Sequence, residues 1–193
     1  MSATDTAARM PAVLESIMSR VSAVTLKDPG PTDEHLRLIL KAATRAPDHG
    51  KLQPWRFVVI EGTARERFGD VTASALEARR PDITAIELQR ERDKIFRAPT
   101  TVAVIAKIIE RKIMPVEQLL AVAAATQNMI LAAHALGYGT MWKTGDAAYD
   151  ATVKEFLGFE AADAVVGFIY LGTIDTMPKN YRETKLEDVI SRL

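Results

Sequence analysis

The sequence predicts an α+β fold in which helices flank a central mixed or antiparallel sheet. The expected elements follow the order helix, helix, strand, two helices, strand, long helix, strand, helix, strand, which is not the regular alternation of a doubly wound parallel sheet. Residues 101–107 form a nearly continuous apolar run, which is typical of a central, buried strand. The 193 residues, 48% hydrophobic and 26% charged, fit one packed domain over residues 1–193 without repeats or linkers.

The N-terminal third predicts two helices that lead into a polar loop. A first helix is expected over about 11–19, because Pro11 suits a first helical turn and apolar residues follow at helical spacing. After a turn at residues 28–31, Thr32 can cap a second amphipathic helix. This second helix delivers the loop that begins at Arg45.

The middle of the chain predicts two strands separated by two helices. Residues 55–61 read as a buried strand, and Thr63 with Glu66 has the spacing of a capping box that opens a third helix. A charged helix is expected over about 83–96. It precedes the central strand at residues 101–107.

The C-terminal part predicts one long helix and a second apolar strand. Residues 116–136 are rich in alanine and apolar on most faces, which is typical of a helix buried in a core or at a subunit interface. Residues 140–143 are short and extended, and residues 151–157 form a small helix. Residues 165–173 are strongly apolar and form a strand, after which residues 174–193 are expected to be a C-terminal extension.

Composition excludes several classes of function. Twenty-five basic residues balance twenty-five acidic ones, so no net charge favours nucleic acid or an anionic membrane surface. The absence of cysteine excludes disulfides, thiolate catalysis, iron–sulfur clusters and cysteine-ligated zinc, so redox chemistry would need a bound cofactor. The histidines at positions 35, 49 and 134 lack paired metal-ligand spacing, so no metal site is expected.

The expected location is the cytoplasm. Residues 1–9 carry no signal-peptide pattern, and no apolar run is expected to approach the ~20 residues that span a bilayer. We therefore expect a soluble cytoplasmic protein without a membrane partner.

The most informative segment is residues 45–57, which read Arg-Ala-Pro-Asp-His-Gly-Lys-Leu-Gln-Pro-Trp-Arg-Phe. The segment joins an amphipathic helix to a strand, and such junctions often hold ligand-binding loops. The alternative is structural: Pro47 and Pro54 would end the helix and begin the strand, with solvated polar residues between them.

The pattern Arg-Ala-Pro-x₅-Gln-Pro-Trp-x-Phe in this loop resembles the signature loop of the nitroreductase family of FMN-dependent enzymes, and in particular its compact YdjA-like branch. Three further segments are similar to the family in order and spacing: residues 96–99 (Phe-Arg-Ala-Pro), residues 137–145 (Gly-Tyr-Gly-Thr-Met-Trp-Lys-Thr-Gly) and residues 166–173 (Val-Gly-Phe-Ile-Tyr-Leu-Gly-Thr). The resemblance implies a three-layer sandwich and a homodimer with flavin at its interface, where residues 174–193 embrace the partner subunit.

The resemblance also implies a set of binding residues. Arg45 and His49 would reach across to a flavin held mainly by the partner subunit. The implied FMN-binding residues are Arg20, Val21, Ser22, Arg45, His49, Trp142, Lys143 and Thr144, and those near the nicotinamide nucleotide are Ala132, Ala133, His134, Ala135, Leu136 and Gly137.

Local alternatives to these roles stay open. Val21 departs from the family pattern, which has a second arginine there, and Arg20 could simply complement a helix dipole. His49 could be a surface residue, and Lys143 could be solvated beside a core Trp142. In the tail, Lys179 and Arg182 could contact the FMN phosphate or be solvated.

The resemblance implies an oxidoreductase that uses NAD(P)H to reduce nitroaromatic, quinone or similar electron-poor small molecules by a ping-pong mechanism. No catalytic side chain is expected, because the flavin carries the chemistry. The chain has little room for the helices that cover the pocket in larger members, which implies an open site. The alternatives are other flavin chemistry, such as dehalogenation, enoate reduction or flavin destruction, or a flavin-binding module with little turnover.

Overall fold

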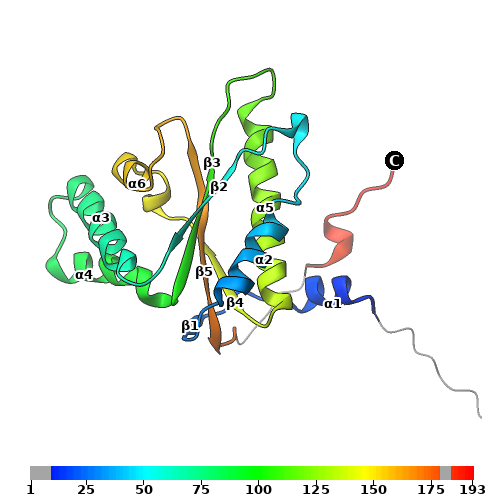
Figure 1. Cartoon of the computed structure of the whole chain (residues 1–193), viewed down its shortest axis with the longest axis horizontal. Helices are drawn as coiled ribbons and strands as arrows, with labels where there is room; N and C mark the ends of the chain where they lie inside the picture. Colours follow the sequence, from blue (N-terminus) through cyan, green and yellow to red (C-terminus); the bar gives the residue numbers. More distant parts are fainter. Residues whose placement is uncertain (1–9, 179–183) are drawn as a thin grey trace, which may run out of the picture.

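The computed structural model describes residues 10–178 and 184–193. A central sheet is covered on one face by α3, α4 and α6 and on the other by α2 and α5 (Figure 1). The strands are β1 (Thr25–Lys27), β2 (Trp55–Ile60), β3 (Thr100–Ala106), β4 (Gly139–Lys143) and β5 (Ala164–Thr176). The helices are α1 (Ala12–Ser19), α2 (Asp33–Ala43), α3 (Ala64–Arg79), α4 (Ala85–Asp93), α5 (Pro115–Ala135) and α6 (Ala151–Phe156), with 3₁₀ turns η1 (His49–Lys51), η2 (Lys94–Arg97), η3 (Asp146–Ala148) and η4 (Leu186–Asp188).

The sheet is antiparallel throughout, which resolves the choice between a mixed and an antiparallel sheet. Its strand order is β1-β5-β3-β2, and β4 also pairs with β5. All seven residues of β3 are buried, so the prediction of a central apolar strand is confirmed. The thirteen-residue β5 pairs with three strands and therefore connects most of the sheet.

Each face of the sheet has its own hydrophobic core. Successive residues of β3 alternate between the two cores, with Ile105 on the α3 side and Val104 on the α5 side, as the period of a strand requires. The α3 side is filled mainly by Phe68, Ile95, Phe168 and Tyr170, and the α5 side by Ile39, Val122, Met129 and Ile169. The two cores make the fold a three-layer sandwich.

Two expected elements differ from the structure at their ends. Thr63 does not cap α3, because its backbone is already helical (φ −68°, ψ −18°) and its side chain makes no capping hydrogen bond. A capping side chain needs an extended backbone, and Thr84 has one (φ −78°, ψ 153°). The capping box is therefore formed by Thr84 and Glu87 at the start of α4, later than the predicted helix start at residue 83.

The strand β1 was not predicted. It has only three residues and one buried side chain, Leu26, so its sequence has no strand period to detect. Its pairing with β5 creates it, and β5 consequently continues to Thr176. The first residues of the expected extension at 174–193 therefore belong to the sheet.

Among the described helices, α5 alone is long and apolar enough, by length and composition, to cross a membrane, with a mean hydropathy of 1.2. The expectation that no apolar run approaches that length was therefore wrong. In the fold, α5 packs against α2, β3 and β5, and Val122 and Met129 are fully buried. Burial in the protein core therefore accounts for the apolar composition of α5.

Candidate functional site

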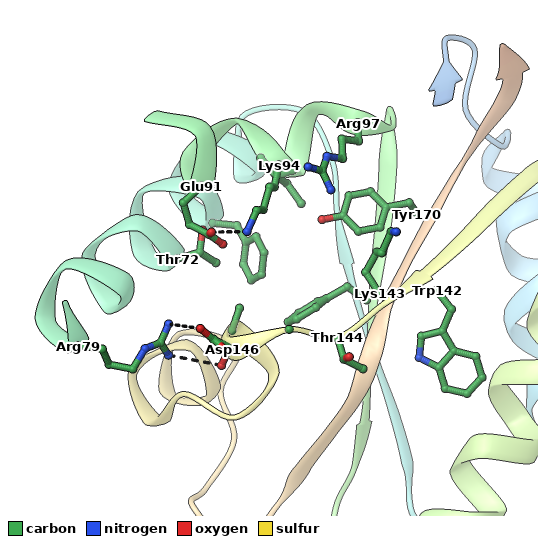
Figure 2. Close-up of a pocket in the computed structure, with 15 residues that line it drawn as sticks. Thr72, Arg79, Glu91, Lys94, Arg97, Trp142, Lys143, Thr144, Asp146 and Tyr170 are labelled. Carbon is green, nitrogen blue, oxygen red and sulfur yellow. Dashed lines mark hydrogen bonds and ion pairs between the residues drawn. The ribbon is translucent and has the colours of Figure 1, made fainter. Parts of the chain in front are cut away.

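A cleft of about 460 Å³ lies on the α3 side of the sheet, where β4 ends (Figure 2). Small-molecule sites commonly have volumes of about 300–1,000 Å³. We call this the β4 cleft. Its lining residues are Phe68, Thr72, Arg79, Glu91, Lys94, Ile95, Arg97, Trp142, Lys143, Thr144, Gly145, Asp146, Ala147, Phe168 and Tyr170.

Three of the predicted FMN-binding residues border this cleft, although the Trp142 indole itself lies on the α5 side of the sheet. Lys143 is on the same side of β4 as the core residue Met141, because side chains two positions apart share a face. The Trp142 indole lies over Gly167 and donates a hydrogen bond from Nε1 to the carbonyl of Val166 (3.1 Å). Thr144 follows the end of the strand.

The segment Arg20–Val21–Ser22 runs beside the opposite end of β4. Immediately after it, the Ala23 N–H donates to the Thr140 carbonyl (3.0 Å). The Arg20 Nε atom is buried and has no hydrogen-bond partner among the described residues. An unsatisfied buried guanidinium nitrogen, in the same short segment as the Ser22 hydroxyl, fits a site for an anionic group such as a phosphate.

Arg45 and His49 lie elsewhere in the protomer. Both are exposed, and His49 Nδ1 pairs with Glu117 Oε2 near the N-terminus of α5. The end of α1, which precedes Arg20, contacts the other end of α5 through Ser19 Oγ and His134 Nε2 (3.0 Å). Glu117 and His134 are about 26 Å apart along the helix, so one protomer does not bring His49 to Arg20.

The loop that carries His49 has an unusual backbone. Gly50 has φ 76°, and the non-glycine residues Lys51 and Gln53 have φ 56° and φ 50°. The Gln53 N–H donates to Asp48 Oδ2 (2.6 Å), which holds the loop in this form. Left-handed backbone at non-glycine residues is costly and is concentrated at functional sites.

The predicted nucleotide-proximal residues form the end of α5 and the turn after it, and none lines the β4 cleft. Ala133 is fully buried, so its side chain is not available to a ligand. Ala135 and Gly137 are exposed, and His134 is occupied by its contact with Ser19. Lys179 and Arg182, the predicted phosphate contacts of the tail, lie outside the described residues.

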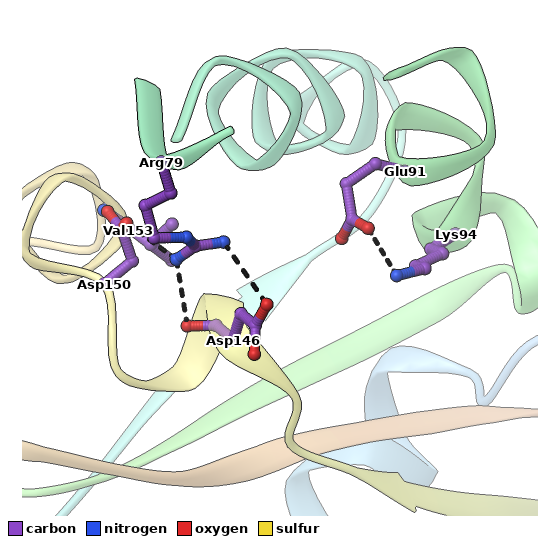
Figure 3. Close-up of polar contacts among 6 residues, drawn as sticks. All are labelled: Arg79, Glu91, Lys94, Asp146, Asp150 and Val153. Atoms are coloured by element: carbon purple, nitrogen blue, oxygen red, sulfur yellow. Dashed lines mark hydrogen bonds and ion pairs between the residues drawn. The ribbon is translucent and has the colours of Figure 1, made fainter. Parts of the chain in front are cut away.

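Sequence reasoning missed the charged residues that α3, α4 and η2 bring to the cleft. Lys94 pairs with Glu91, and Arg79 Nη1 donates to Asp150 Oδ2 (2.9 Å) and lies near Asp146 (Figure 3). These residues lie on segments that read as solvated helices, and their sequence carries no signal that they face a pocket. Only the packing of α3 and α4 over β4 places them there.

Tyr170 on β5 was also missed, although it lies within a segment that resembles the family. Burial raises the pKa of its phenol to about 12; the nearby Arg97 acts in the opposite direction, and Glu91 adds to the increase. The phenol is therefore protonated at neutral pH and is able to donate a hydrogen bond into the cleft.

The model of the nitroreductase family matches residues 17–173. The candidate NAD(P)H nitroreductase YdjA of Escherichia coli K12 is 42% identical over 161 residues, which cover 83% of this chain and 87% of YdjA. A candidate NAD(P)H nitroreductase of Haemophilus influenzae is 32% identical over 177 residues, covering 91% of this chain and 94% of that protein.

Solved structures agree with this match. The nitroreductase-like family protein from Bacillus cereus has a TM-score of 0.82 at 23% identity, covering 100% of this chain and 98% of that one, which confirms the predicted fold. A candidate nitroreductase from Desulfovibrio desulfuricans, solved in complex with FMN, has a TM-score of 0.73 at 26% identity, covering 95% and 98%.

Proposed function

Because the chain belongs to the nitroreductase family, we propose that it is an FMN-dependent oxidoreductase that transfers electrons from NAD(P)H to nitroaromatic, quinone or similar electron-poor acceptors. One observation carries the proposal: Trp142, Lys143 and Thr144 line one cleft of small-molecule size. The FMN-bound relative from Desulfovibrio desulfuricans supports the choice of cofactor.

The residues present fit FMN. Arg20 and Ser22 supply a cation and a hydroxyl for the phosphate and ribityl oxygens. The buried Nε of Arg20, which has no partner within the described part of the chain, supports that role. Lys143 would place an ammonium group beside the ring and stabilise negative charge there. Bound FMN supplies the hydride and electron chemistry, and we propose that donor and acceptor use the open cleft in turn.

A homodimer explains why the predicted site is divided between the two ends of α5. The helix α1 has no buried residue, and its apolar side chains Val13 and Met18 are each 70% exposed. Leu120 of α5 is 64% exposed. Exposed apolar side chains on both helices support a subunit interface there. We propose that α1 and α5 pack against a second copy, which places Arg45 and His49 near the partner subunit's flavin.

The proposed dimer interface also includes the C-terminal extension. Beyond β5, the described residues 184–193 are exposed and include the apolar residues Val189 and Ile190. We propose that residues 1–193 form one domain whose C-terminal extension lies on the partner subunit.

We expect the Val13→Glu variant to dimerise at least about tenfold more weakly, because a charge would replace a valine whose burial contributes about 1.5–3 kcal/mol. Sedimentation velocity over a range of concentrations measures the change, and FMN affinity should fall with it. Ile86→Glu is the matched control, since Ile86 of α4 is 66% exposed and lies away from α1. An unchanged dimer in Val13→Glu would place the interface elsewhere.

The proposed function predicts a yellow protein that releases FMN on heating and is bleached by NADH or NADPH without oxygen. Lys143→Ala should retain less FMN or be reduced more slowly, because the charge beside the ring is lost. Lys41→Ala, which removes an exposed lysine on α2, is the control. Absorbance spectra and stopped-flow reduction give both quantities.

Three outcomes distinguish the alternatives. A colourless protein that fails to bind added FMN would contradict the site. Reduction of bound flavin without turnover of any acceptor would favour a flavin-binding module. Turnover confined to halogenated phenols or enoates, rather than nitroaromatics and quinones, would identify other flavin chemistry on the same scaffold.

A further inference from the structure

The β4 cleft concentrates positive charge in a chain whose net charge is zero. Four cationic side chains line it, against the two carboxylates of Glu91 and Asp146. Positive charge gathered in a partly desolvated cleft attracts anionic ligands. The cations are Arg79, Lys94, Arg97 and Lys143.

Two of these cations are already engaged. Arg79 is held by Asp146 and Asp150, and Lys94 is paired with Glu91 (Figure 3). Within residues 10–178 and 184–193, Arg97 and Lys143 have no carboxylate at ion-pair distance. The charge of Arg97 is therefore available to an acceptor, and Lys143, proposed to lie beside the flavin ring, adds a second charge at the same end of the cleft (Figure 2).

The Tyr170 hydroxyl lies in the same part of the cleft as these two cations. Figure 2 shows Arg97, Tyr170 and Lys143 grouped at one end, with the hydroxyl directed into the open space. Tyr170 is only 6% exposed, and among the described residues its hydroxyl has no hydrogen-bond partner. A buried phenol with its polar end in a cavity is suited to donate to a ligand.

Apolar side chains form the adjoining wall of the cleft. Phe68, Ile95 and Phe168 line it, and the Phe68 and Phe168 rings pack edge to face with centroids 5.3 Å apart. An aromatic ring would contact this wall, while a guanidinium is able to bind both oxygens of a carboxylate on that ring. The cleft thus offers complementary surfaces to the two ends of a small aromatic acid.

We propose that Arg97, Lys143 and Tyr170 form an oxyanion subsite that holds the carboxylate of an aromatic electron acceptor. This inference rests on the proposed function and names its substrate class. The same chemistry would also bind the 2′-phosphate of NADPH, and the test separates these two sources.

The test compares 4-nitrobenzoate with its neutral counterpart 4-nitrobenzamide in the FMN-loaded protein. We expect Arg97→Met to lower the ratio of the two kcat/KM values, benzoate over benzamide, by about tenfold or more, because a charged hydrogen bond is lost. Tyr170→Phe should lower the same ratio by a smaller factor of about two to ten. The ratio cancels any general loss of activity in a variant.

Arg90→Met is the matched control, since Arg90 is an exposed arginine of α4 that does not line the cleft. Its ratio should equal that of the unmodified protein. Calorimetric Kd values of the two compounds give the same ratio without turnover, so the subsite is tested even if the proposed reaction is not observed.

An equal ratio in the unmodified protein and in Arg97→Met would overturn the subsite. A change confined to the preference for NADPH over NADH would also overturn it, because the oxyanion would then belong to the nucleotide. Failure of the proposed function looks different: the protein would lack FMN or reduce neither acceptor, while the binding ratio would remain measurable.

Discussion

Replacing Gly167 with valine is expected to lower the unfolding free energy by about 1–3 kcal/mol, the usual cost of overpacking, and to weaken FMN binding because Trp142 is displaced. A Cβ atom at Gly167 would lie 2.1 Å from Trp142 Nε1 and 3.0 Å from the carbonyl oxygen of Lys143. The indole would have to leave its position and lose its hydrogen bond to Val166. Titration of the apoprotein with FMN, followed by flavin fluorescence, measures the effect.

A second substitution separates the clash from the role of Trp142. In the double variant Gly167→Val with Trp142→Leu, the smaller side chain leaves room for the valine, so thermal stability should recover. FMN affinity should stay low, since the proposed contact is gone. Recovery of both would show that Trp142 does not contact the flavin and that the single substitution acted by distorting β4.

The elements that sequence identified best are those whose pattern is set locally. The apolar run of β3 and the alanine-rich sequence of α5 each identify the type of element without information about the neighbours it packs against. Thr32 caps α2 through a hydrogen bond from the His35 N–H (3.2 Å), as its sequence spacing predicts. Thr63 had equally good spacing, but the backbone after the Gly62 turn is already helical, and sequence does not reveal that conformation.

The candidate site was predictable only where it is contiguous in sequence. Trp142, Lys143 and Thr144 share one strand end, so a single motif finds all three. Arg97 and Tyr170 come from η2 and β5, and the fold alone brings them together. Charged residues on α4 read as a solvated face because a helix period does not specify which neighbour covers it.

The predicted FMN-binding residues are divided between the two ends of α5, and the sequence does not show this separation either. His49 and Arg20 both belong to segments that resemble the family, yet α5 keeps them apart within one protomer. Sequence similarity identifies residues that act together without showing which subunit supplies each. The separation along α5 within one protomer supports the proposed site shared between two copies.

The Ile169→Ala variant is expected to lose about 2–5 kcal/mol of unfolding free energy. Ile169 is fully buried in the α5-side core, and it stands opposite Val102 of β3 and Trp142 of β4. Truncation removes apolar contacts and leaves a cavity that three paired strands prevent from collapsing. The melting temperature should fall by about 4–20 °C for a chain of this length.

Urea unfolding at fixed protein and FMN concentrations measures the loss, because both dimerisation and cofactor binding shift apparent stability. The slope of free energy with urea should not change if the truncation affects only the native core. Ile86→Ala, at a position that is 66% exposed, should stay within about 0.5 kcal/mol of the unmodified protein. A loss below about 1 kcal/mol in Ile169→Ala would mean that β5 relaxes into the cavity. That result would contradict the view that β5 connects β3 and β4 rigidly.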